Sequence, residues 1–451
     1  MSQLFGTDSA KGAIPAAVSA ELAMQAGQAA AVFFSGKKDK QTTILIGKDT
    51  ALSSDMTEAA IAAGISSAGG KAVLMGTMPY PALCHLVRTH EADAGIMVSK
   101  AHNAANSSGM RLIGADGRPV TADRIEQIEQ LVYGNIRSAE SGSIGEIVRG
   151  EESISEYTSY IASIASADLS GMRVALLCSD KSCIAPAQTL LTEAGADVVL
   201  MPEQSETQDS GIDLAATALE QLMEFTVSSA ADCGLAIGED GGSCLAADEN
   251  GHLVDGDVLL AIFAKSMKER GRLNNNTAAA SPFSSFSLTR FARDNGISIV
   301  TTGANSRYIL ERMIEDNCSL GGEKSGHIIF LDDMPTGDGL LCGMRLLKIM
   351  KETGKPLSVL AVEIQKLPQV IVNVPIGRRF LEIWKNDSSI TSLISRYSDE
   401  LGSEGRILVR EGGGQEPAIR VIIEGRDFGT INEMAMRVSE QIRLKCPRKS
   451  R

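Results

Sequence analysis

Short apolar runs alternate with stretches of helical period over most of the chain. The runs are continuous rather than interleaved with polar residues, which is typical of strands covered on both faces of a sheet. This alternation of strand and helix predicts α/β units. We interpret as strands residues 43–47, 72–75, 95–98, 174–178, 198–201 and 298–301, and as helices residues 55–68, 185–194 and 308–315.

The C-terminal part follows a different pattern. Apolar runs at 370–374, 406–410 and 419–423 predict strands, and helical patterns span 390–401 and 431–444. Strands and helices that are segregated within one stretch of chain predict a small α+β domain.

The length limits the number of domains. At about 150 residues per domain, 451 residues predict roughly three domains. Residues 141–151 (SGSIGEIVRGE) are rich in Gly and Ser, and we interpret them as a linker between the first two blocks.

The charge balance restricts the partners. The composition of 43% apolar and 22% charged residues is that of a folded globular protein. There are 43 basic and 56 acidic residues, which gives a net charge of −13. We therefore expect no nucleic-acid partner, because phosphate neutralisation needs a basic face, whereas a local anion pocket stays open.

Apolar runs, the N-terminus and the cysteines indicate the cellular compartment of the protein. No apolar run approaches the about 18 residues of a membrane span, and the N-terminus has no basic-then-apolar leader. Eight cysteines are scattered without a C-x-x-C pair, which indicates reduced thiols rather than a disulfide frame or a zinc site. We expect no membrane partner and a cytoplasmic protein.

Four Gly-rich or polar loops carry the candidate chemistry. They are residues 5–12 (FGTDSAKG), 99–103 (SKAHN), 238–243 (GEDGGS) and 321–327 (GGEKSGH). Ligands of open α/β sheets bind in loops at the carboxyl ends of strands. A tight turn explains any single loop, so their order along the chain is the more specific observation.

In this order the loops resemble those of the α-D-phosphohexomutase superfamily, and most closely those of the bacterial phosphoglucosamine mutase family. The resemblance covers essentially the whole chain. It extends to GKDTALSS at 47–54, RYILERM at 307–313, TGDGLL at 336–341 and GRILVREGGGQEPAIRV at 405–421.

The resemblance implies a four-domain architecture around a central cleft. Three related α/β domains would span 1–145, with the nucleophile loop, 146–255, with the metal loop, and 256–368, with the sugar-binding loop. An α+β domain at 369–451 would hold the phosphate-binding loop.

The resemblance also implies a reaction. Members of the family move a phosphoryl group between C6 and C1 of a hexose phosphate. A phosphoserine in the second loop donates the group and later recovers it, and three Asp residues hold the Mg²⁺ that polarises it. Such chemistry needs an in-line nucleophile and a cation that neutralises the developing oxygen charge.

This chain departs from that pattern at the reacting centre. Ala101 stands at the phosphoserine position, between Lys100 and His102, and a methyl group cannot carry a phosphoryl group. In the metal loop the three Asp positions are Gly238, Asp240 and Gly242, so Asp240 is the remaining metal-ligand candidate. We therefore expect no cofactor, whereas an active enzyme would require Mg²⁺.

Other positions keep a binding function. The resemblance assigns Glu323, Ser325 and His327 to sugar hydroxyls, which suits their donors and acceptors. It assigns the phosphate to Arg410, Arg420 and, in the first loop, Lys11.

Lys100 is open to two interpretations. Its ammonium group would stand in for the missing metal cation, or the side chain simply points into solvent from a loop.

Three functional hypotheses follow. The first is a catalytically inactive homologue that binds a hexose phosphate as a sensor, scaffold or partner subunit. The alternative is an active intramolecular phosphotransferase that interconverts hexose or hexosamine 6-phosphate and 1-phosphate with a displaced nucleophile such as Ser99, Ser107 or Ser108. The third is a structural protein that binds no sugar. A homodimer or a protein partner stays open under each hypothesis.

Overall fold

The computed structural model describes most of the chain, and the statements below concern these residues. They are 18–36, 40–100, 108–134, 136, 139–140, 143–150, 153–202, 214, 216–303, 306–364, 366–381, 384–411 and 417–447. They fold into two compact units. The first unit lies within residues 1–284 and 292–363, and the second within 285–291 and 364–451.

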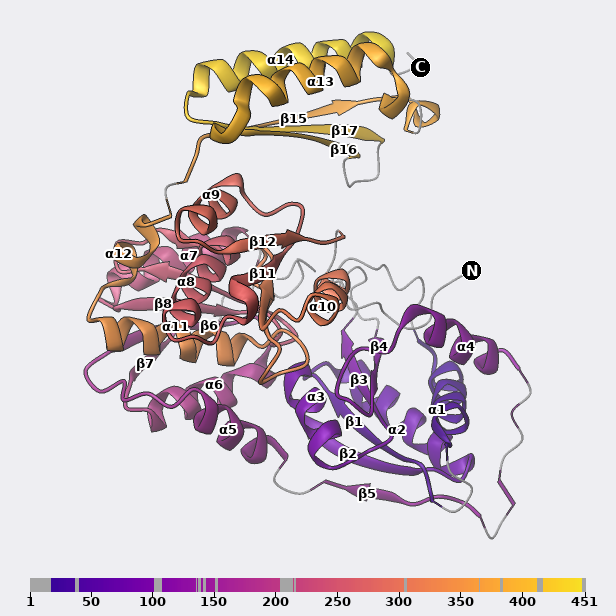
Figure 1. The fold of residues 1–451 in the computed structure, drawn as a ribbon. Coiled ribbons are helices and arrows are strands. Elements are labelled where there is room, and N and C mark those ends of the chain that lie inside the picture. Colours follow the sequence, from indigo (N-terminus) through magenta and orange to yellow (C-terminus); the bar gives the residue numbers. More distant parts are fainter. Residues whose placement is uncertain are drawn as a thin grey trace. The chain divides into compact units, whose positions relative to one another are not determined.

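The first sheet of the first unit has five strands in the order β4-β3-β1-β2-β5 (Figure 1). All neighbours are parallel except the β3–β4 pair. The strands are β1 (Thr43–Lys48), β2 (Lys71–Thr77), β3 (Ala94–Lys100), β4 (Ser108–Gly114) and β5 (Ile147–Arg149).

Helices cover both faces of this sheet. They are α1 (Ala20–Phe34), α2 (Leu52–Ser67), α3 (Tyr80–Thr89) and α4 (Ala122–Val132). Helices α1, α2 and α4 share one apolar core with Ile44 and Ile46 of β1. Helix α3 packs on the opposite face, where Leu83 approaches Gly47.

Two glycines let α1 and α2 approach closely. A Cβ atom at Gly64 would lie 2.0 Å from the carbonyl oxygen of Met24, and one at Gly27 would lie 2.3 Å from that of Ile61. Real atoms do not come this close, so both positions require glycine for packing rather than for a turn.

The linker prediction for residues 141–151 is wrong in one respect. Strand β5 lies inside this segment and extends the first sheet by pairing with β2, with Val148 beside Val73. The strand has three residues, and Ile147 and Arg149 are exposed, so it carries no apolar run that sequence patterning would detect.

The second sheet has the order β10-β9-β8-β6-β7. Its strands are β6 (Arg173–Cys178), β7 (Asp197–Leu200), β8 (Cys233–Ile237), β9 (Cys244–Asp248) and β10 (Leu253–Val254). Its helices are α5 (Ser153–Ile164), α6 (Lys181–Glu193) and α7 (Ala216–Ser228).

The third sheet has the order β12-β11-β13-β14. Its strands are β11 (Thr277–Ala280), β12 (Ser298–Thr301), β13 (Leu320–Gly322) and β14 (Ile328–Phe330). The helices of this part of the chain are α8 (Gly256–Glu269), α9 (Phe286–Asp294), α10 (Ser306–Glu315), α11 (Gly339–Thr353) and α12 (Leu357–Val362). Helix α11 packs on β8 and β9 of the second sheet, and most of α9 belongs to the second unit.

Polar contacts join the three sheets within the first unit. The hydroxyl of Tyr157 on α5 donates to a carboxylate oxygen of Asp338 at 2.9 Å. The carbonyl oxygen of Asp333 accepts from the hydroxyl of Tyr160 at 2.8 Å and from the guanidinium of Arg88 at 3.2 Å. Segments that are remote in sequence therefore meet around α3, α5 and residues 331–338.

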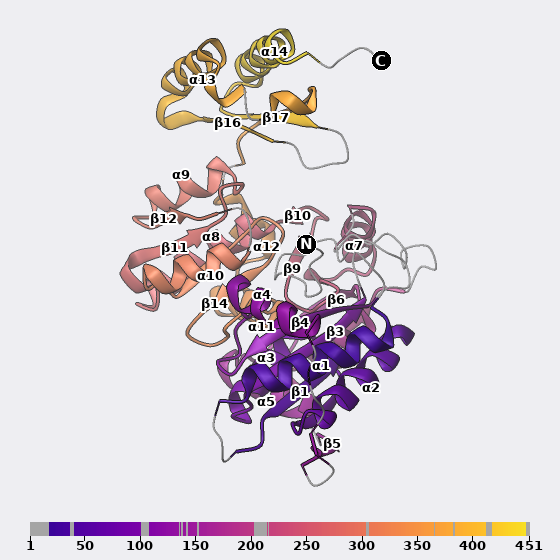
Figure 2. The ribbon, with the colours of Figure 1, turned by 90° about the vertical axis from the view of Figure 1, so that its right-hand side faces the viewer.

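The second unit is an antiparallel sheet covered by helices on one face (Figures 1 and 2). The sheet has the order β15-β17-β16, with β15 (Gln369–Pro375), β16 (Arg406–Glu411) and β17 (Ala418–Glu424). Helices α13 (Ser388–Leu401) and α14 (Phe428–Lys445) pack on it.

The predicted fold class, several α/β domains followed by a C-terminal α+β domain, is confirmed. The apolar runs interpreted as strands coincide with β1, β2, β3, β6, β7, β12, β15, β16 and β17. All eight cysteines have free thiols. Within the described part of the chain, no helix is both long and apolar enough to cross a bilayer.

Replacing Gly64 by Ala tests the close contact between α1 and α2. The added methyl group collides with backbone, so we expect Gly64→Ala to lower the free energy of unfolding by about 1–3 kcal/mol. Gly36→Ala is the matched control, because the nearest atom to its Cβ would be 3.9 Å away. Urea unfolding measures both, and equal midpoints for the two variants would contradict the packing account.

Buried His85 makes the stability depend on pH. Its side chain is 2% exposed and stacks on Tyr160 at 4.1 Å. Burial, assisted by the Arg88 charge, lowers the pKa of His85 from 6.5 to about 4. The unfolded chain therefore binds a proton between pH 6.5 and 4 that the folded chain does not bind, so stability falls as pH falls through this window.

We expect His85→Gln to flatten that pH dependence. The His85 contribution is about 3–4 kcal/mol at most, since one pKa unit corresponds to about 1.4 kcal/mol. Urea unfolding of both proteins at several pH values between 4 and 7 measures the difference. An identical slope in both would show that His85 is not a buried neutral group.

Candidate functional site

The candidate site lies where loops of the three sheets of the first unit meet. The Tyr80 N–H donates to the Asp240 carbonyl at 2.8 Å, which joins α3 to the loop at 238–243. The Gly339 N–H donates to the Gly241 carbonyl at 2.8 Å, which joins the same loop to α11. The structure therefore brings segments of all three sheets to the loop that the sequence analysis assigned to the metal.

The loop at 321–327 joins the same junction. Its backbone contacts the second sheet, because Cys244 N–H donates to the Gly326 carbonyl at 3.0 Å. It also contacts the start of α8, where Gly256 N–H donates to the Lys324 carbonyl at 3.0 Å. Gly326 has φ +91°, and a Cβ there would lie 2.3 Å from the Cys244 carbonyl oxygen, so this position requires glycine.

Asp240 lies in a tight turn between β8 and β9. The Gly241 N–H donates to the Gly238 carbonyl at 3.0 Å, and Gly241 adopts φ +77°. The Gly242 N–H donates to one Asp240 carboxylate oxygen at 2.8 Å. The turn therefore fixes the direction of the Asp240 side chain, which is only 22% exposed.

Arg111 supplies the charge that Asp240 needs. It lies on β4, and its Nη1 donates to the other Asp240 carboxylate oxygen at 2.8 Å. Its guanidinium also lies over the ring of Tyr80, 3.9 Å from the ring centre, which adds a cation–π interaction. The Arg111 side chain is 15% exposed.

These neighbours determine the ionisation of Asp240. Burial on its own would raise the pKa of the carboxyl group. The Arg111 guanidinium, the Gly242 N–H and the nearby His327 outweigh burial and lower the pKa of Asp240 to about 2. Asp240 is therefore an anion at neutral pH, and Arg111 balances its charge within the chain.

The residues of this loop do not fit a magnesium ion. Mg²⁺ requires oxygen ligands in near-octahedral geometry and usually takes one or two carboxylates together with waters or phosphates. Asp240 is the only carboxylate at the three aligned positions, and both of its oxygens already accept hydrogen bonds. Among the residues that the structure describes, no three His, Cys, Asp or Glu side chains are grouped to hold a metal.

The predicted sugar-binding residues lie together on one hairpin. Glu323, Ser325 and His327 lie between β13 and β14, which pair antiparallel with Gly322 beside Ile328. Ser325 is exposed, and Glu323 and His327 are half-buried. The His327 ring faces Gly337, where a Cβ would lie 2.5 Å from the ring.

Two buried polar atoms at this junction have no hydrogen-bond partner within the described part of the chain. They are Nε2 of His327 and Oγ1 of Thr336. Buried polar atoms are almost always hydrogen-bonded, so unpartnered ones mark a place where a ligand or water binds. The sequence analysis did not single out Thr336, although the TGDGLL motif begins there.

Asp49, directly after β1, forms hydrogen bonds that hold the end of β3 next to the end of β1. One carboxylate oxygen of Asp49 accepts from the backbone N–H of Lys100 at 2.5 Å. The other accepts from the Ser54 hydroxyl at 2.6 Å and from the Ala51 N–H at 3.0 Å.

The sequence analysis considered Lys100 as a replacement for the metal cation. The cation that the structure places against Asp240 is Arg111, which the sequence analysis missed.

The two predicted phosphate ligands of the second unit face each other across β16 and β17. Arg410 lies directly opposite Arg420, and Arg420 Nε donates to the Asn373 side chain at 2.8 Å. Burial and the neighbouring Arg420 charge lower the pKa of Arg410. Because like charges directly opposite destabilise a sheet, a bound anion would relieve this pair.

Several predicted positions lie outside the described residues. They are Lys11, Ala101, His102, Ser107 and the glycines of the loop at 412–416.

Comparison with known proteins places the chain in a family. Sequence profiles of the phosphoglucomutase/phosphomannomutase family match its alpha/beta/alpha domain I at residues 2–137 and its domain III at residues 255–367. Proteins named phosphoglucosamine mutase are similar over nearly the whole length. The one from Acetivibrio thermocellus is 37% identical over 98% of this chain and 99% of its own.

A second relative of that name, from Clostridium novyi, is 35% identical over 99% of this chain and all of its own. The chain therefore belongs to the phosphoglucomutase/phosphomannomutase family of the phosphohexomutase superfamily, and within it resembles the phosphoglucosamine mutases. A crystal structure of a family member from Burkholderia thailandensis shares the fold, with a TM-score of 0.78, 17% identity and coverage of 96% of this chain and 95% of the other.

Removing Arg111 tests the ion pair. We expect Arg111→Met to lower the free energy of unfolding at pH 7 by about 1–3 kcal/mol, because it leaves a partly buried carboxylate without its cation. The pKa of Asp240 is lowered from 3.8 to about 2, so the contribution of the pair is present above pH 4 and disappears as pH falls toward 2. Urea unfolding at pH 7 and near pH 2.5 measures the change.

The matched control is Arg173→Met, which breaks an ion pair to Asp197 whose side chains are 47% and 60% exposed. An exposed pair contributes less than about 1 kcal/mol. An equal loss in both variants, or a loss from Arg111→Met that persists unchanged at low pH, would contradict the account.

Proposed function

We propose that this chain binds a hexose or hexosamine phosphate without running the phosphoserine cycle of its family. Glu323, Ser325 and His327 would hold the sugar hydroxyls, and Arg410 and Arg420 the phosphate. Lys11 in the first loop would add a further charge. The observation that carries the proposal is the neutralisation by Arg111 of Asp240, the one carboxylate at the three aligned metal positions.

The unpartnered atoms at the junction support a polar ligand. His327 Nε2 and Thr336 Oγ1 are buried, and each would gain a hydrogen bond from a sugar hydroxyl. A hydroxyl is both donor and acceptor, so it suits either tautomer of the ring. Arg111 is also suited to this role, because a guanidinium has five N–H donors and can bind an oxyanion while it pairs with Asp240.

The position of the nucleophile supports the absence of turnover. Ala101 offers no oxygen to carry a phosphoryl group. Removing the nucleophile of other enzymes costs about 10⁴–10⁶ in rate, which leaves no useful mutase. A protein that binds the sugar phosphate without converting it would act as a sensor, a scaffold or a partner subunit.

A second candidate function is an active phosphoglucosamine mutase. It is favoured by the full-length similarity of 35–37% to proteins of that name. It requires a displaced nucleophile, and Ser99 near the end of β3 is a candidate. The Ser99 side chain is half-buried. It also requires Mg²⁺, for which the loop around Asp240 has a poor ligand set.

We also propose the four-domain division at residues 1–145, 146–255, 256–368 and 369–451. A homodimer or a protein partner would be needed for a sensor or scaffold role.

Calorimetry with glucosamine 6-phosphate in EDTA tests the proposed function. We expect binding between micromolar and millimolar, which corresponds to roughly −8 to −4 kcal/mol, with no change when Mg²⁺ replaces EDTA. Glu323→Gln and Arg420→Met should each weaken binding about tenfold, as expected for one charge-assisted hydrogen bond. Arg378→Met, at an exposed cation outside the site, is the control.

A coupled assay for glucosamine 1-phosphate separates the two candidates. We expect no turnover above background, with or without Mg²⁺ and a hexose bisphosphate. Mg²⁺-dependent turnover that Ser99→Ala abolishes would establish the second candidate. No binding of glucosamine 6-phosphate, glucose 6-phosphate or a bisphosphate would overturn both.

A further inference from the structure

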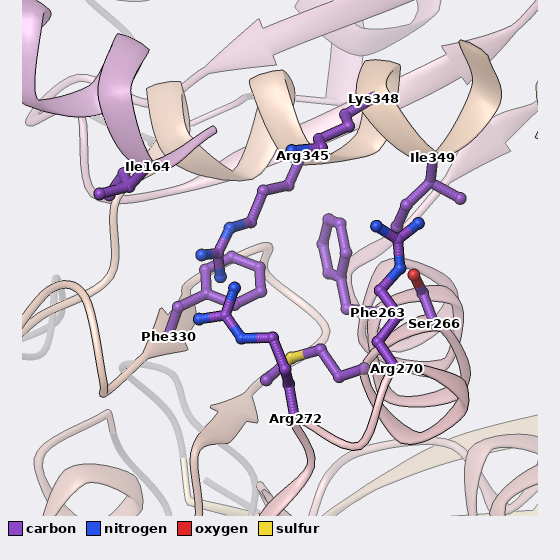
Figure 3. A pocket seen from close by; sticks show the side chains of 10 residues that line it. Ile164, Phe263, Ser266, Arg270, Arg272, Phe330, Arg345, Lys348 and Ile349 are labelled. Carbon is purple, nitrogen blue, oxygen red and sulfur yellow. The ribbon is translucent and has the colours of Figure 1, made fainter. Parts of the chain in front are cut away.

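A pocket lies in the first unit, away from the candidate site (Figure 3). Its walls come from the end of α5, from α8 and the turn after it, from β14 and from α11. Four of its ten lining residues are cationic: Arg270, Arg272, Arg345 and Lys348. The remaining walls are mostly apolar, with Phe263 and Phe330 among them.

The pocket is separate from the sugar site, although α11 reaches both. The helix begins at Gly339, whose N–H donates to Gly241 in the loop of Asp240. Lys348 follows nine residues later. At a rise of about 1.5 Å per residue this places it about 13 Å further along the helix.

The guanidinium groups are held in place around the pocket. Arg345 donates to a carboxylate oxygen of Asp333 at 2.5 Å and lies over the Phe330 ring, 4.1 Å from its centre. Arg272 approaches the other carboxylate oxygen of Asp333 at 3.9 Å. Figure 3 shows the heads of Arg345 and Arg272 side by side next to Phe330.

The charges of the pocket do not balance within the described part of the chain. Asp333 forms ion pairs with both Arg345 and Arg272, and Glu352 forms one with Arg270. The charge of Glu269 also acts on Arg270, so four cations face three carboxylates. Among the described residues Lys348 forms no salt bridge, although its charge acts on Glu352. This local excess of positive charge stands out in a protein whose net charge is −13. A basic concavity on an acidic protein concentrates anions of matching size.

The volume matches a phosphate group. The cavity measures about 70 Å³. A cavity of roughly 10–15 Å³ holds one water molecule, so this pocket has room for about five, the number of heavy atoms in a phosphate. Guanidinium groups bind phosphate oxygens through paired N–H donors, and the Ser266 hydroxyl on the pocket wall adds another donor.

We propose that this pocket is a binding site for a phosphate dianion, either free or as a monoester, and that it is distinct from the sugar-phosphate site. Arg272 and Lys348 hold the oxygens, and Arg345 forms the fixed inner wall. An ester substituent would extend along the apolar residues at the rim.

Calorimetric titration of the full chain with inorganic phosphate tests the proposal. The buffer contains EDTA and a constant ionic strength set with chloride. We expect saturable binding that Arg272→Met and Lys348→Met each weaken about tenfold, the loss for one charge-assisted contact. Both positions tolerate the change, because Arg272 is exposed and Lys348 has no ion pair in the described structure. Arg378→Met, an exposed cation of the second unit, should leave the affinity unchanged.

Variants of the sugar site distinguish this pocket from that site. We expect Arg420→Met to leave the phosphate affinity of this pocket unchanged while it weakens glucosamine 6-phosphate binding. Methyl phosphate and acetate are titrated for comparison. If methyl phosphate binds more tightly than inorganic phosphate, the ligand is a monoester. If inorganic phosphate binds more tightly, the ligand is free phosphate. Acetate binding as tight as that of phosphate would overturn the dianion assignment.

Phosphate binding that Arg420→Met removes and that Arg272→Met and Lys348→Met leave intact would overturn the second site. So would the absence of saturable binding at millimolar phosphate. Neither result depends on glucosamine 6-phosphate binding. The proposed sugar site and the proposed phosphate pocket are therefore tested independently.

Discussion

The ion pair between Arg111 and Asp240 is the interaction on which the candidate site depends. Asp240 lies in a turn whose backbone contacts α3 through Tyr80 and α11 through Gly339. Arg111 reaches this turn from β4 and packs on the ring of Tyr80. The pair therefore connects the first sheet to the second, next to the backbone hydrogen bond by which the loop at 321–327 contacts Cys244.

This pair also decides which chemistry the site can support. A divalent cation would bind phosphate oxygens directly and polarise them, whereas a guanidinium attracts and orients them by hydrogen bonds. Withdrawing both charged groups from water is costly, and the hydrogen bond from Gly242 and the cation–π contact with Tyr80 help to offset that cost. In the proposed function this pair would leave the Arg111 guanidinium, rather than a metal ion, as the cation beside the ligand.

The sequence predicted the fold well, because the central strands of the first two sheets, such as β1 and β8, are buried and their apolar runs are continuous. Strand β5 escaped detection since its three residues are mostly exposed and it is held only by pairing with β2. The approach of α1 and α2 through Gly27 and Gly64 also has no local signal, because it depends on where the partner helix lies.

The site was predictable only in part. Motif order identified the loops at 238–243 and 321–327, and the structure places them at one junction. Arg111 could not be found in the same way, because it is 129 residues from Asp240 in sequence and only the folded chain brings the two together. An isolated Asp in a Gly-rich turn is usually solvated, and the burial of Asp240 comes from neighbours on other domains. The burial of the Thr336 hydroxyl, which has no hydrogen-bond partner among the described residues, likewise depends on tertiary packing.

The most direct test of the central claim is a titration of the full chain with Mn²⁺, followed by the electron paramagnetic resonance signal of the free ion. The account predicts that the free signal rises in proportion to added Mn²⁺, because Arg111 already neutralises Asp240. A stoichiometric loss of free signal that Mg²⁺ reverses and Asp240→Asn abolishes would show that a divalent metal, and not the guanidinium, is the cation of this site.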